Sequence, residues 1–172
     1  MHPSALAGSG LLDTEVDWLA HGRRLIAQYD PSVVVVEFTG DYGFLGTRPG
    51  IVPFTASFYN AWAQVSQRLE DILCSRGATV YWVVGPVVAN PTNNASIATL
   101  GKIYAHLHAP NSPSGHPPLI DVTPALSGAT GRYAEFLPGP GGHPVQVRQP
   151  DGTHFTIYGV TLFARAIAEV IA

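Results

Sequence analysis

The sequence has little charge and a single cysteine. Among its 172 residues, charged side chains make up 12%, the net charge is −3, and Cys74 is the one cysteine. One cysteine excludes a disulfide within the chain, and the chain lacks the clustered Lys and Arg of a nucleic-acid-binding surface. We therefore expect no nucleic-acid partner, and we expect Cys74 to be a small buried hydrophobic residue.

Long hydrophobic runs are also missing. No stretch approaches the ~20 apolar residues of a membrane span, and residues 1–10 carry neither the basic region nor the apolar run of a secretory signal. We expect no membrane span, and the cellular compartment stays open. The chain has no cysteine pair and no His-Glu-x-x-His motif, so we expect no metal and no cofactor.

The chain has enough apolar residues to form the core of one domain, and we expect a single domain over residues 1–172. Helical and strand patterns alternate along the chain, which is typical of a parallel sheet covered by helices, and we predict a three-layer α/β/α sandwich. A long irregular segment rich in Gly and Pro is expected over 123–149. The predicted helices are 14–29, 55–75, 94–108 and 157–171, and the predicted strands are 32–38, 79–84 and 119–122.

The segment Asp151-Gly152-Thr153-His154 is the most informative motif. Its spacing lets the carboxylate of Asp151 accept a hydrogen bond from one ring nitrogen of His154 while the other nitrogen faces a cleft. Such a pair activates a hydroxyl nucleophile in hydrolases. The competing interpretation is structural, with Asp151 as a helix N-cap and Thr156 as a further capping candidate.

Two glycine-containing turns are candidates for an oxyanion hole or a substrate contact. Gly40 and Asp41 directly follow the predicted strand 32–38, and Gly8 and Gly10 precede the first predicted helix. Backbone N–H groups in such turns can point at an anion. Both segments are equally compatible with ordinary turns built from Gly and Asp.

The segments VVVVEFTGD, VYWVVGP and VRQPDGTHFTIYG resemble the SGNH/GDSL hydrolase family, in particular its actinobacterial and acyltransferase-associated members. The resemblance implies a flavodoxin-like sandwich, with Asp151 and His154 as the triad Asp and His, and with Gly8 or Gly10 as an oxyanion-hole glycine. Asp41 falls where the family has an oxyanion-hole Asn. This is a departure, because an ionised Asp has no proton to donate to an oxyanion.

A larger departure is the absence of the Gly-Asp-Ser block that carries the family's nucleophile. Relative to the family, we expect the first two strands and the helix between them to be missing before Met1. Ser9 is a poorly placed substitute for the nucleophile, because the sequence predicts no strand before it. Three hypotheses stay open: an ester hydrolase acting on acyl esters or acylated carbohydrate, a non-catalytic binding domain, and an N-terminally truncated hydrolase. If the strands are missing, the edge at 33–36 invites pairing. We expect residues 1–13 or a second copy of the chain to cover it, or the reading frame to continue upstream with a Gly-Asp-Ser strand.

Overall fold

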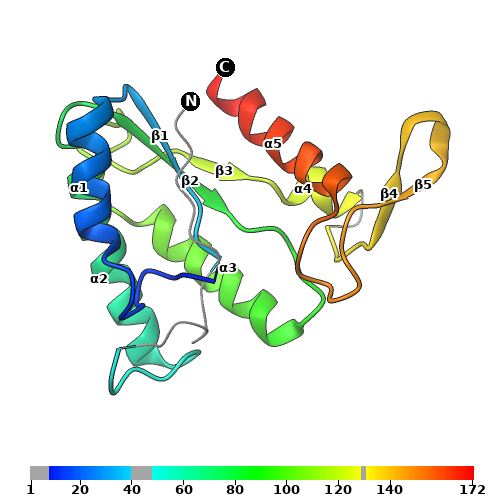
Figure 1. Cartoon of the computed structure of the whole chain (residues 1–172), viewed down its shortest axis with the longest axis horizontal. Coiled ribbons are helices and arrows are strands. Elements are labelled where there is room, and N and C mark those ends of the chain that lie inside the picture. The colour runs from blue at the N-terminus through cyan, green and yellow to red at the C-terminus, as the bar shows by residue number, and fades with distance from the viewer. Residues whose placement is uncertain (1–7, 40–47, 129–130) are drawn as a thin grey trace.

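A three-stranded parallel sheet forms the centre of the protein. The structure is a computed structural model that describes residues 8–39, 48–128 and 131–172. The sheet has the order β1 (Val33–Val36), β2 (Thr79–Val84), β3 (Leu119–Asp121), and both pairings are parallel (Figure 1). The predicted α/β class with a parallel sheet is therefore confirmed.

Three helices cover one face of the sheet: α1 (Trp18–Tyr29), α2 (Ala56–Leu73) and α3 (Pro91–Ala105). Trp62 from α2 and Trp82 from β2 are fully buried between these layers, and Cys74 is buried and free as expected. Burying large aromatic side chains is a main source of stability in a core of this kind. The core on this face contains Leu11, Leu12, Ile26, Val36, Phe58, Val65, Leu69, Leu73, Val80, Leu100, Tyr104 and Leu107.

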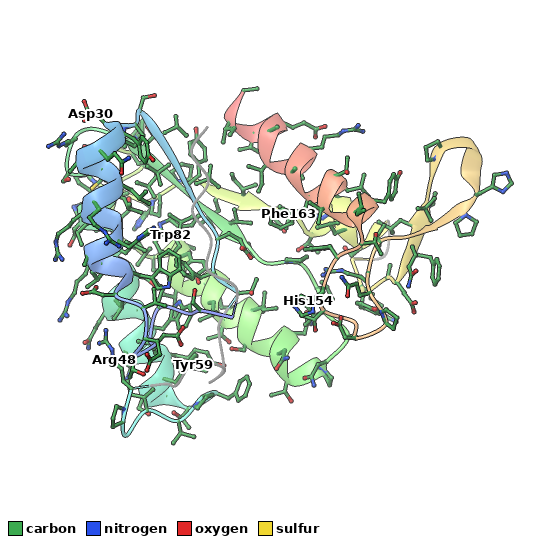
Figure 2. The ribbon with its side chains drawn as sticks, in the orientation of Figure 1. Asp30, Arg48, Tyr59, Trp82, His154 and Phe163 are labelled. Carbon is green, nitrogen blue, oxygen red and sulfur yellow. The ribbon has the colours of Figure 1, made fainter. Side chains whose placement is uncertain are left out.

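The opposite face is covered by α5 (Ile157–Ile171) and by the short helix α4 (Thr123–Leu126). Phe163 of α5, labelled in Figure 2, is one of the partly buried side chains that pack against the buried cluster of Val83, Ile120, Val122 and Leu126. The hydroxyl of Thr156 caps α5 by accepting from the backbone N–H of Gly159 at 3.2 Å, as expected of an N-cap threonine. Helices on both faces give the predicted three layers.

The segment 123–149 differs from the prediction of a long irregular loop. It contains α4 and an antiparallel hairpin of β4 (Phe136–Pro138) and β5 (Pro144–Gln146), joined through the 3-10 turn η2 (Pro140–Gly142). The strands are too short and too rich in proline to show a two-residue hydrophobic alternation. The hairpin projects past the N-terminal end of α5 (Figure 1).

Two helix starts also differ from the prediction. The first helix begins at Trp18, because the carboxylate of Asp17 accepts from the N–H of Ala20 at 2.9 Å and makes Asp17 the N-cap. The third helix begins at Pro91, because the side chain of Asn90 caps it, and proline fits the first turn of a helix. Cap geometry, rather than hydrophobic period, sets both starts.

At the end of the sheet, β1 pairs only with β2 among the residues that the structure describes. Val33 is 43% exposed there.

Within the described ranges, no helix has the length and apolar character needed to cross a membrane.

Candidate functional site

The turn from Asp151 to His154 is held by its own carboxylate. One oxygen of Asp151, Oδ1, accepts the backbone N–H groups of Thr153 and His154, each at 2.9 Å. The other, Oδ2, lies 2.6 Å from Nδ1 of the His154 ring. These bonds, the Thr153 N–H first and then the His154 ring, lower the pKa of Asp151 to about 2. Asp151 is therefore ionised at neutral pH. It is not the N-cap of α5, because Thr156 occupies that position.

The ionised carboxylate of Asp151 fixes the tautomer of the His154 ring, because it can only accept a hydrogen bond. With Nδ1–H donating to Asp151, Nε2 is the nitrogen left to exchange a proton with another group. The His154 side chain is 74% exposed and that of Asp151 is 47% exposed. The pair therefore lies at the protein surface and is not buried in the core. Figure 2 shows His154 on the segment that leads into α5.

Asp151 and His154 line a cavity of about 560 Å³. Its walls come from the segments that leave β1 and β2, from the start of α3, and from the N-terminal segment that holds Gly8 and Ser9. This is the carboxyl edge of the parallel strands, where α/β proteins bind ligands. The other lining residues are Glu37, Thr39, Pro86, Val88, Asn93, Ile97, Arg148, Thr153 and Phe155.

The structure separates the two candidate glycines near the N-terminus. Gly8 lines the cavity with a φ of 71°, a conformation that favours glycine. The N–H of Gly10 donates to Oδ2 of Asp13 at 2.7 Å, so this N–H is directed at a carboxylate and not at the cavity. Gly40 and Asp41 lie outside the described residues, and the neighbouring Thr39 lines the cavity.

A second cavity of about 570 Å³ runs between α1 and β1. Gly8, Ser9, Glu37 and Thr39 line both cavities. These four residues therefore form a wall that the two cavities share.

Arg148 is a residue of the cavity to which the Asp151–His154 motif assigns no role. The structure buries Arg148 to 1% exposure and places it among the residues that line the cavity. Burial lowers the pKa of Arg148 to about 10. Its place in the sequence gave one signal: it lies three residues before Asp151, in the same segment as the motif.

The arrangement orients an imidazole for proton transfer at the rim of a cavity that hydroxyl side chains also line. Among the described residues, Ser9 is the only serine that lines the cavity. The chain therefore folds so that residues 8–9 and 151–154, at opposite ends of the sequence, share one site. Periodicity along the sequence carries no information about such a contact.

Comparison with known families assigns the chain without giving it an activity. A family model described as "Protein of unknown function (DUF459)" matches residues 3–170, and the chain belongs to this family. No curated protein matches the chain.

Proposed function

We propose that this member of DUF459 is an ester hydrolase of the SGNH type, acting on acyl esters such as O-acetyl groups on carbohydrate. The observation that carries the proposal is the bond between Oδ2 of Asp151 and Nδ1 of His154 at 2.6 Å, in a turn at the rim of a cavity. A carboxylate with a pKa of about 2 stays ionised throughout the physiological range. It stabilises the imidazolium that forms when Nε2 takes a proton from a nucleophile.

In the proposed mechanism, His154 first acts as a base and then as an acid. Nε2 removes the proton of a serine hydroxyl as the serine oxygen bonds to the ester carbonyl carbon. When the bond from that carbon to the alcohol oxygen breaks, Nε2 gives the proton to the leaving alcohol. Water then attacks the acyl-enzyme with the same base, which releases the carboxylic acid and restores the serine. Ser9 is the candidate nucleophile in the cavity, and a serine supplied from an upstream segment is the alternative.

The experiment is hydrolysis of short p-nitrophenyl esters by this 172-residue chain and its variants. We expect weak turnover, because Ser9 lies in the stretch 8–12, which is neither helix nor strand, and a nucleophile needs a rigid element to hold it against its base. His154→Ala and Asp151→Asn should abolish it. His143→Ala should not, because His143 is exposed on the β4–β5 hairpin and is not among the residues that line the cavity. Turnover that survives His154→Ala would refute the proposed role of the pair.

The nucleophile is tested separately with a fluorophosphonate probe, which modifies activated serines. Labelling of Ser9 that is lost in His154→Ala identifies Ser9 as the nucleophile. If labelling and turnover are absent and return only when the DNA upstream of Met1 is translated with the chain, the nucleophile is upstream.

The second candidate is a non-catalytic binding domain. The observation that favours it is the exposure of His154, since a finished acid/base site is usually shielded from water. An absence of turnover from every form, together with amide shifts of Thr153 and His154 when O-acetylated glucose is added, would support this candidate.

A further inference from the structure

We infer that Arg148 is a positioning residue that docks the Asp151–His154 turn onto the segment that leaves β2. The inference rests on the proposed role of this pair. It names a residue that acts through the backbone of the turn and not on a substrate.

A single guanidinium joins three parts of the site. Nη1 of Arg148 donates to the carbonyl of Thr153, inside the turn, at 2.6 Å. Nη2 donates to the carbonyl of Val87, in the segment after β2, at 2.9 Å. The guanidinium carbon also lies 3.9 Å from the ring centre of Phe155. Two hydrogen bonds from separate guanidinium nitrogens, together with a face against an aromatic ring, are what the rigid fork of an arginine provides and a lysine does not.

The burial of Arg148 argues that this geometry is needed. The side chain is 1% exposed, and its Nε is buried without a hydrogen-bond partner. Among the described residues, no ion pair joins it to a carboxylate. The charge of Asp151 acts on Arg148 from beyond ion-pair distance, and burying a cation without a directly bonded carboxylate is unfavourable. An apolar residue would fill the space at lower cost, so the carbonyls of Thr153 and Val87 are the groups that favour arginine here.

A second contact docks the same two segments independently of Arg148. The N–H of Ala89 donates to the carbonyl of Gly152 at 3.0 Å. Gly152 has a φ of 71°, and a Cβ at this position would overlap the Cβ of Ala89. The backbone of the turn therefore lies directly against residues 87–89, and only glycine permits this approach.

Docking matters because His154 has little packing of its own. Its side chain is 74% exposed, so neighbouring side chains cannot fix the ring. The ring position depends on the bond to Asp151, and the position of Asp151 depends on where the turn is held. Arg148 holds the turn on its inner side, at Thr153.

The test compares Arg148→Met and Arg148→Lys, with Arg165→Met as the control. Arg165 lies exposed on α5 and is not among the lining residues of the cavity. The readouts are the NMR titration of the Asp151 carboxyl carbon and the exchange rates of the Thr153 and His154 amides, which donate to this carboxylate. None of these readouts uses ester turnover, so a failed esterase assay leaves this test intact.

We expect both Arg148 variants to raise the midpoint of the Asp151 titration from about 2 toward 3.8, by about one pH unit or more, because a loosened turn forms its hydrogen bonds less often. The two amides should exchange faster, while the amide of Trp82 in the core stays protected. Arg165→Met should leave all of these values unchanged. If Arg148→Met does not fold, Arg148→Lys, which keeps the charge, decides the question.

An unchanged Asp151 midpoint and unchanged amide exchange in a folded Arg148→Met protein would overturn the inference. Wild-type behaviour of Arg148→Lys would also overturn it, because charge and not the fork would then be sufficient.

A second arm uses the other contact. Gly152→Ala should raise the Asp151 midpoint in the same way, and adding Ala89→Gly should restore part of the loss by removing the overlap of the two Cβ atoms. A double variant no better than Gly152→Ala would show that the overlap with Ala89 does not contribute to the loss.

Discussion

Replacing Glu70 by Gln should remove a specific pH dependence of stability. Glu70 lies on α2 at 1% exposure, and its Oε2 accepts the indole N–H of Trp82 at 2.7 Å. Burial raises the pKa of Glu70 from 4.5 to about 7, opposed by the Trp82 hydrogen bond and assisted by the charge of Asp71. The folded protein therefore binds a proton at Glu70 more tightly than the unfolded chain does.

The sign follows from this order of pKa values. A carboxyl whose folded pKa is raised contributes stability that is fully present below pH 4.5 and is lost as the pH rises to about 7. At ~1.36 kcal/mol per pH unit, the interval from 4.5 to about 7 corresponds to at most about 3.4 kcal/mol of unfolding free energy. Solvent screening reduces this value, so we expect a loss of about 2–3 kcal/mol.

The assay is urea unfolding of the wild type and Glu70→Gln at several pH values between 4 and 8. A glutamine amide oxygen can still accept from Trp82, but it does not ionise. The free-energy difference between the two proteins should therefore change by about 2–3 kcal/mol across the interval, in favour of the variant at high pH. Glu169→Gln, an exposed acid on α5, is the control and should follow the wild type. Parallel curves for the wild type and Glu70→Gln would refute the reasoning.

Two further predictions concern the sheet and its last helix. Gly159→Ala should lower the free energy of unfolding by about 1–3 kcal/mol, because a Cβ at this position would overlap the carbonyl of Val147. Helix propensity alone would instead favour Ala by ~1 kcal/mol. A variant that is more stable than the wild type in urea unfolding would therefore contradict the overlap. We also predict that the chain self-associates through the edge of β1 and that Val33→Lys weakens this association in sedimentation velocity, because a lysine on an edge strand blocks pairing with a second chain. Equal behaviour of wild type and variant would show that β1 is not an interface.

Much of the fold could be predicted because it depends on local sequence. The β-branched runs at 33–36 and 79–84 form strands at the expected positions, since continuous apolar runs are typical of strands in covered parallel sheets. That 33–36 is the partly exposed edge strand and 79–84 the buried central strand was decided by the sheet order. The hydrogen bond of Asp151 to His154 is local as well: the two residues are three positions apart, and the turn around Gly152 brings them together. The helix starts at Trp18 and Pro91 were missed by several residues, because side-chain caps set them.

The surroundings of the Asp151–His154 pair were decided by tertiary structure. Arg148 reaches Val87, which is 61 positions away, and Ser9 shares a cavity with His154 from the other end of the chain. Hydrophobic periodicity reports which face of an element is buried, and it does not report which distant segments meet at the carboxyl edge of a sheet. The Asp151–His154 pair could therefore be predicted from the sequence. The cavity that it lines and the contacts of Arg148 with Thr153 and Val87 form only when the sheet brings distant segments together.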